Sequence, residues 1–156
     1  MTEFFRAEQR VLYGDTDSMG VAYYANYLKW FEIGRTELFR SAGSTYRSWE
    51  ERGCFLPVYE AYCRYHKPAR YDDVIHIETT FSLAGKLRLR FDYRLYDKNN
   101  GTLLAEGYTV HVCTDKDGRV IKPLPELKKF IKRMEEMSSG GHSKGKAVDR
   151  KVKFQG

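Results

Sequence analysis

The chain changes from strand to helix within residues 13–27, which read YGDTDSMGVAYYANY. Gly14 and Gly20 bound a short segment that carries two acids, Asp15 and Asp17. A run of glycine, aspartate, threonine and serine between two apolar segments is typical of a loop. This stretch therefore fixes where the first strand ends and where the first helix begins.

A long helix is predicted after the loop, from about Ala22 to Ala42. Tyr27, Phe31, Gly34 and Leu38 recur at helical spacing and make one apolar face. A glycine in the middle of a helix lowers its stability, so we expect Gly34 to mark a close approach of another backbone.

Strands are expected before and after this helix in the sequence. The first is Glu8–Tyr13, and four more follow as a meander: Pro57–Tyr65, Val74–Phe81, Leu87–Tyr96 and Leu103–Thr114. Leu87–Tyr96 alternates apolar and charged residues, which is typical of an antiparallel strand with one wet face. Short helices are expected from Ser44 to Arg52 and, behind Pro125, from Glu126 to Met137. The pattern predicts an α+β fold in which a curved antiparallel β-sheet of about five strands wraps a long central helix.

Charge is distributed unevenly over the 156 residues, which carry a formal net charge of +6. Residues 138–156 hold five basic residues and one acid, and they are rich in glycine, serine and lysine without periodicity. We expect one domain over residues 1–137 and a flexible basic tail over residues 138–156. Nucleic-acid binding would rest mostly on that tail, so it is not the expected function.

No metal, cofactor or membrane segment is indicated by the residue types and their spacing. Cys54, Cys63 and Cys113 are odd in number and widely spaced, and the four histidines form no ligand motif. We expect reduced thiols, no metal and no cofactor. No apolar run is long enough to span a membrane, and the first residues are too poor in apolar side chains for a signal peptide, so the expected location is cytoplasmic.

The two acids before the helix suggest chemistry, although two interpretations remain open. The N-terminus of a helix presents unpaired N–H groups that hold a carbonyl oxygen as it becomes an oxyanion. A carboxylate beside it serves as a nucleophile or a general base, so Asp15 and Asp17 would suit thioester hydrolysis. An Asp-x-Asp pair before a helix is, however, more often a capping or turn device.

A wider set of residues resembles a known enzyme family. The set is Asp15-Thr16-Asp17, Gly20-Val21, Tyr23, Asn26-Tyr27, Phe31 and Arg35-Thr36-Glu37, followed by Tyr65, Pro68-Ala69 and Tyr71-Asp72-Asp73. It is similar to the hotdog-fold acyl-CoA thioesterases of the 4-hydroxybenzoyl-CoA thioesterase and YbgC type. The resemblance covers roughly residues 5–133 and agrees with the order of strands and helices derived above.

The resemblance implies roles for particular residues. Asp17 matches the catalytic carboxylate, Asp15 matches an acidic position that is structural, and the backbone N–H of Tyr24 matches the group that polarises the thioester carbonyl. YbgC-type members carry His where this chain has Tyr24, whereas the 4-hydroxybenzoyl-CoA type can carry Tyr, so we expect no histidine in the mechanism. Expected substrate-binding residues are Tyr13, Gly20, Val21, Tyr27, Arg88 and Arg90, the two arginines toward the CoA phosphates.

The resemblance also implies partners, namely an acyl-CoA substrate and a homodimer or homotetramer with the site between subunits. The alternative is a non-catalytic hotdog module that binds acyl-CoA. A hotdog dehydratase would want a histidine beside the acid, and no histidine lies between Met1 and Phe55. The acyl group cannot be derived from the residues.

Overall fold

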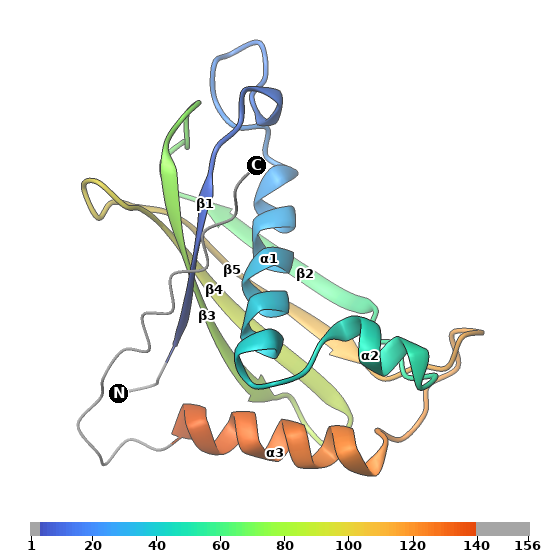
Figure 1. Ribbon diagram of the computed structural model, residues 1–156. Helices are drawn as coiled ribbons and strands as arrows, with labels where there is room; N and C mark the ends of the chain where they lie inside the picture. The colour runs from blue at the N-terminus through green and yellow to red at the C-terminus, as the bar shows by residue number, and fades with distance from the viewer. Residues whose placement is uncertain (1–3, 140–156) are drawn as a thin grey trace.

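An antiparallel sheet and one long helix form two layers in the structure, a computed structural model that describes residues 4–139 (Figure 1). The strands are β1 (Phe5–Arg10), β2 (Val58–Tyr65), β3 (Val74–Leu83), β4 (Arg88–Asp97) and β5 (Leu103–Val112). The helices are α1 (Asn26–Ser41), α2 (Tyr46–Glu51) and α3 (Pro125–Ser139), and a 3₁₀ turn, Tyr13–Asp15, follows β1. The predicted α+β architecture, with five strands and a long helix, is confirmed.

The strands lie in the order β1-β3-β4-β5-β2, and every neighbouring pair is antiparallel. The prediction that four consecutive strands form a meander is wrong, because β2 pairs with β5 and not with β3. Residues 66–73, the crossover segment, connect the edge strand β2 to β3, which lies next to the opposite edge strand β1. The amide of His66 bonds to the carbonyl oxygen of Leu104 at 2.8 Å, and Asp73 accepts from the amide of Val11 at 2.8 Å. The segment therefore crosses one end of the sheet.

The core lies between α1 and the inner face of the sheet. Alternate residues of β3 and β4 point inward and are buried, among them Ile77 and Phe91. The ring of Phe31 on α1 stacks on that of Tyr93 at 4.3 Å. The alternation predicted for β4 is thus confirmed, and its charged residues line the outer face.

Gly34 is where α1 comes closest to the sheet. A Cβ atom at this position would lie 2.8 Å from Cγ2 of Ile77 and would also collide with Oγ1 of Thr79. The absence of a side chain lets the helix axis settle onto β3. The approach is close, as the sequence led us to expect, but the atoms of the sheet that meet Gly34 belong to side chains and not to another backbone.

The first strand is displaced from its predicted position. It was expected over Glu8–Tyr13 and occupies Phe5–Arg10. The reason is the alternation of burial, because Phe5 and Ala7 face the core where they pair with β3. The residues after Arg10 leave the sheet and enter the loop.

The long helix also begins later than predicted, at Asn26 and not at Ala22. The amide of Ala22 donates to the carbonyl oxygen of Ala69 at 2.8 Å. This bond to a distant segment keeps residues 22–25 outside the helix. Tyr24 and Ala25 then form a turn that leads into α1, in which the amide of Asn26 donates to the carbonyl oxygen of Tyr23 at 3.0 Å.

α3 lies across the end of the molecule at which α1 terminates (Figure 1). It buries Leu127, Phe130, Ile131 and Met134, and the Phe130 ring lies 5.0 Å from that of Phe39. The helix includes residues 138 and 139, which the sequence placed in the tail. The rest of the predicted tail, residues 140–156, lies outside the described residues.

β2 is an exposed edge strand. Its neighbour is β5 on one side only, and Val58, Tyr59, Tyr62 and Tyr65 are all exposed. A strand edge with large apolar side chains is normally protected or paired with another chain.

Candidate active site

Asp17 lies at the base of a tight loop. Thr16 and Ala22 form an isolated antiparallel bridge. Inside it, the amide of Asp17 donates to the carbonyl oxygen of Val21 at 2.9 Å, and the amide of Gly20 donates to that of Asp17 at 3.0 Å. Gly20 has φ +76°, a conformation that glycine adopts without strain. Gly20 and Val21 therefore shape the loop that holds Asp17.

The Asp17 carboxylate is half-buried and only partly used by the protein. Its Oδ1 accepts from the amide of Met19 at 2.9 Å. Within residues 4–139, no donor bonds to its Oδ2. One oxygen thus anchors the side chain, and the other is open to a substrate or a water.

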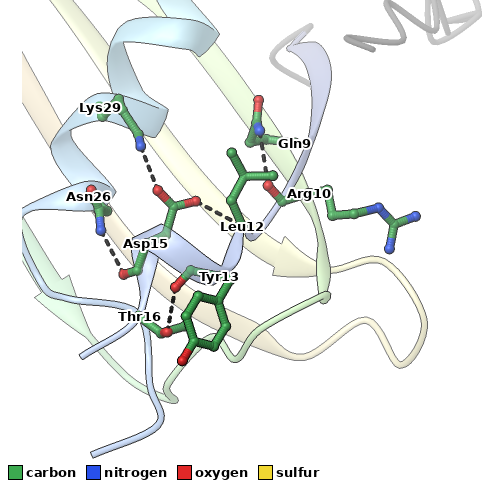
Figure 2. Close-up of polar contacts among 8 residues, drawn as sticks. All are labelled: Gln9, Arg10, Leu12, Tyr13, Asp15, Thr16, Asn26 and Lys29. Carbon is green, nitrogen blue, oxygen red and sulfur yellow. Dashed lines mark hydrogen bonds and ion pairs between the residues drawn. The ribbon is translucent and has the colours of Figure 1, made fainter. Parts of the chain in front are cut away.

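The carboxylate and the carbonyl oxygen of Asp15 are both hydrogen-bonded within the protein (Figure 2). Its side chain is buried, and it accepts from the amide of Leu12 at 2.9 Å and from Nζ of Lys29 at 2.7 Å. Its carbonyl oxygen accepts from Nδ2 of Asn26 at 2.7 Å and from the amide of Tyr23 at 2.8 Å. Asp15 therefore ties the loop to the first turn of α1, which agrees with the structural role expected for it.

The crossover segment supports the loop from the other side. Ala69 accepts from the amide of Ala22 at 2.8 Å and donates its own amide to the hydroxyl oxygen of Tyr27 at 3.0 Å. The hydroxyl of Tyr65, at the end of β2, donates to the carbonyl oxygen of Tyr24 at 2.9 Å. The two blocks of residues that carry the family resemblance are therefore in contact.

The N-terminal end of α1 offers hydrogen-bond donors. Ala25, the residue before the helix, does not cap it with a side-chain hydrogen bond. The amides of Tyr24 and Ala25 donate to no acceptor in the part of the chain that the structure describes. Unpaired amides at a helix N-terminus carry partial positive charge. They are suited to a carbonyl oxygen that gains negative charge.

Two tyrosines lie beside Asp17. The rings of Tyr23 and Tyr24 are 4.6 Å apart, and both are exposed. The pKa of the Tyr23 hydroxyl is raised, first by its hydrogen bond with Tyr24 and to a smaller extent by the negative charge of Asp17. Asp17 is therefore within electrostatic reach of the Tyr23 hydroxyl.

Tyr13 and Tyr27, two of the predicted substrate-binding residues, have different surroundings. Tyr27 is buried and packs edge-on against Tyr65 at 4.9 Å. Tyr13 is 78% exposed and contacts Tyr71 edge-on at 5.7 Å. Tyr27 holds the core and the crossover segment together, whereas Tyr13 projects from the loop and is free to contact a ligand.

Arg88 and Arg90 are not brought to the loop within one chain. Arg90 pairs with Ser82 on β3, whereas Arg10, next to the loop, pairs with Val74. The separation along the strand is roughly 25 Å. Arg90 also bonds to the carboxylate of Asp92 at 3.0–3.2 Å, which raises its pKa.

Lys29 is a supporting residue that sequence reasoning missed. No role at the loop was predicted for it, and its Nζ forms an ion pair with Oδ1 of Asp15. The only signal in the sequence is a cation one turn into a helix that follows an acidic loop. Spacing alone could not show which of the two acids it meets.

Residues 4–139 contain neither a metal-ion cluster nor a membrane-spanning helix. No group of three or more histidine, cysteine, aspartate or glutamate side chains is arranged to hold a metal ion. None of the helices in this range has the length and apolar character needed to cross a membrane.

Known proteins share this sequence and fold. The family model described as the thioesterase-like superfamily matches residues 11–133. The acyl-CoA thioester hydrolase YbgC of Escherichia coli is 36% identical over 115 residues, which are 73% of this chain and 84% of that protein. The 1,4-dihydroxy-2-naphthoyl-CoA hydrolase of Synechococcus elongatus is 35% identical over 121 residues, 76% of this chain and 88% of that protein.

A solved structure of a thioesterase has the same fold as this chain. The DHNA-CoA thioesterase from Staphylococcus aureus superposes with a TM-score of 0.82 at 25% identity, over 88% of this chain and 95% of that one. The family match spans most of the chain, and the relatives align over most of their own lengths. The chain therefore belongs to the thioesterase-like superfamily, a family of hotdog-fold thioester hydrolases.

Proposed function

We propose that the protein is an acyl-CoA thioesterase in which Asp17 is the catalytic carboxylate and the amide of Tyr24 polarises the thioester carbonyl. One observation carries this proposal. A single loop-to-helix connection holds an open carboxylate oxygen on Asp17 and unpaired amides at Tyr24 and Ala25. Thioester hydrolysis needs this pair of features.

The chemistry follows from the two parts. The thioester oxygen accepts from the Tyr24 amide, which stabilises the negative charge that develops on it. In one route, Asp17 attacks the carbonyl carbon, the C–S bond breaks, CoA leaves as a thiolate, and water then hydrolyses the mixed anhydride. In the other route, Asp17 takes a proton from a water that attacks the same carbon. Both routes yield the free acid and CoA.

Asp17 and Asp15 divide the work in this scheme. The buried Asp15 holds the loop against Lys29 and Asn26, so the start of α1 is fixed before substrate binds. A donor that is already in position needs no reorganisation during the reaction. No histidine takes part in the proposed reaction.

A second subunit would complete the substrate site. Arg88 and Arg90 lie at the far end of the sheet from Asp17, so a role for them in holding CoA phosphates requires a neighbouring chain. The exposed β2 edge offers a surface for such a neighbour. We propose a homodimer or homotetramer on these grounds, with Tyr13, Gly20 and Val21 contacting the acyl-CoA.

The test is hydrolysis of short, long and aromatic acyl-CoA esters, followed by detection of the free thiol. Asp17→Asn should reduce kcat by at least about 100-fold, in the range of a catalytic acid or base. Asp115→Asn is the matched control, because Oδ1 of Asp115 also accepts from the amide two residues ahead, at 2.9 Å. It should keep full activity. A folded Asp17→Asn variant with near wild-type turnover would contradict the proposal.

A single-turnover reaction in ¹⁸O-labelled water separates the two routes. Label that enters the Asp17 carboxylate identifies Asp17 as the nucleophile. Binding of acyl-CoA without release of thiol by the wild type would instead favour a non-catalytic acyl-CoA-binding module.

A further inference from the structure

A pocket lies at the opposite end of the protein from the Asp17 loop. It has a volume of about 510 Å³ and is formed by the β3–β4 hairpin, residues 122–123 and α3. We call it the α3 pocket. Figure 1 shows α3 across the end where α1 terminates, whereas the Asp17 loop precedes the other end of α1. Its volume is in the range of small-molecule sites.

The floor of the α3 pocket is aliphatic. Leu89 and Ile131 are buried, and Leu83 and Leu87 are 39% and 45% exposed. Covering two half-exposed leucines with an apolar group is favourable by about 25 cal/mol for each Å² removed from water. No aromatic ring lines this pocket. The floor therefore suits an alkyl chain better than a nucleotide base, which binds by stacking on aromatic side chains.

The rim of the α3 pocket is positively charged. Lys86, Lys122, Lys128 and Lys132 line it together with a single acid, Glu135. Within residues 4–139, none of the four lysines takes part in an ion pair. Lys128 and Lys132 are four residues apart on one helix, where like charges destabilise by a few tenths of a kcal/mol. An anion at the rim would remove that repulsion.

The outer face of the sheet has a hollow whose charges are balanced differently from those of the α3 pocket. A hollow of about 680 Å³ there is lined by cations and acids together, and its Arg90 is bonded to Asp92. Its charges are already compensated by the protein. The α3 pocket differs because its excess of positive charge has no such partner among the described residues.

We propose that the α3 pocket binds a long-chain carboxylate, with the alkyl chain on the leucine floor and the carboxylate among the lysines. The protein's own residues 140–156 are a poor occupant, because they carry five basic residues and one acid and so have the same sign as the rim. The site is separate from the Asp17 loop, so binding does not depend on the catalytic role of Asp17.

The test is titration of the full-length protein with laurate below its micelle concentration, followed by calorimetry. We expect saturable binding that Lys128→Gln/Lys132→Gln weakens at least fivefold. The matched control is Lys129→Gln/Lys116→Gln, which removes the same charge from the same helix and a distant turn but not from the pocket. It should change the dissociation constant less than twofold. Leu87→Asp, at an exposed position, should weaken binding at least fivefold without unfolding the protein.

Three ligands distinguish the parts of the proposal. Acetate should not bind measurably, because it lacks the chain, and dodecyltrimethylammonium should not compete, because its charge is reversed. Adenosine 3′,5′-bisphosphate should not displace laurate. The proposal is overturned if laurate does not saturate by about 1 mM, if the control variant weakens binding as much as the pocket variant, or if the nucleotide competes.

Discussion

The buried amide of Ala69 donates to the hydroxyl oxygen of Tyr27 at 3.0 Å, and this bond fastens the crossover segment to the first turn of α1. Ala69 is wholly buried and Tyr27 nearly so. The same alanine accepts from the amide of Ala22. Tyr27 is therefore a residue of the framework that holds the loop, although the sequence suggested that it would contact substrate.

Tyr27→Phe should lower the free energy of unfolding by about 1–3 kcal/mol, because it leaves a buried amide without an acceptor. Urea denaturation measures the change. Tyr65→Phe is the comparison, because it removes a hydroxyl that donates to Tyr24 at an exposed position. It should cost less than about 1 kcal/mol. Equal losses in the two variants would show that burial of Ala69 does not matter.

Gly34→Ala should destabilise the protein by about 1–3 kcal/mol, although alanine favours a helix by about 1 kcal/mol over glycine. The added methyl group would collide with Ile77 and Thr79. Gly14→Ala is the control, since a Cβ there meets nothing within 4 Å. Thermal unfolding of both variants checks the prediction, which fails if Gly34→Ala is more stable than the wild type.

Asp15→Ala and Asp17→Ala should have opposite signatures. Asp15→Ala removes the acceptor of the Leu12 amide and leaves Lys29 unpaired, so we expect a loss of about 2–3 kcal/mol. Asp17→Ala removes one exposed hydrogen bond, and stability should fall by less than about 1 kcal/mol while turnover is lost. Denaturation and activity measured on the same samples separate the two. A stable, inactive Asp15→Ala variant would reverse the assignment.

His111 should make stability depend on pH. Burial lowers its pKa to about 4, against the hydrogen bond from its Nδ1–H to the carbonyl oxygen of Leu56, which raises it. In the unfolded chain the group binds a proton near pH 6.5, so the unfolded state gains protons first as pH falls. The stabilisation is fully present above about pH 6.5 and is lost between that value and about pH 4.

The loss from this group should be about 3 kcal/mol over that range. His111→Gln should have a shallower fall in unfolding free energy between about pH 7 and pH 4 than the wild type. Carboxylates titrate in the same window, so the difference between the two proteins is the quantity to measure. Parallel curves for wild type and variant would contradict the assignment.

Local sequence patterns were sufficient to predict most of the helices and strands. The short helix expected from Ser44 to Arg52 is present as α2, and the alternation in β4 placed its buried face correctly. Gly34 was identified because a helix interior is an unfavourable place for glycine without a packing reason. These features depend on neighbours close in sequence, or on one face of one element.

Features that depend on distant partners were not predicted. The position of β2 beside β5 is decided by pairing over a long separation, which no local period reveals. Asn26 begins α1 because the amide of Ala22 is bonded to Ala69, far along the chain. The burial of the Glu37 side chain, which forms an ion pair with Arg40, was likewise not predicted.

The crossover segment has a consequence for how the protein is made. Residues 15–22 emerge early from the ribosome, but their anchor Ala69 follows much later in the chain, and the bond between His66 and Leu104 forms only after Leu104 has been synthesised. Contacts of such long separation close late, because the intervening chain must be ordered first. A nascent chain that ends before β5 would lack the bond between His66 and Leu104, so the crossover segment that supports the Asp17 loop is held at the sheet only once β5 has been made.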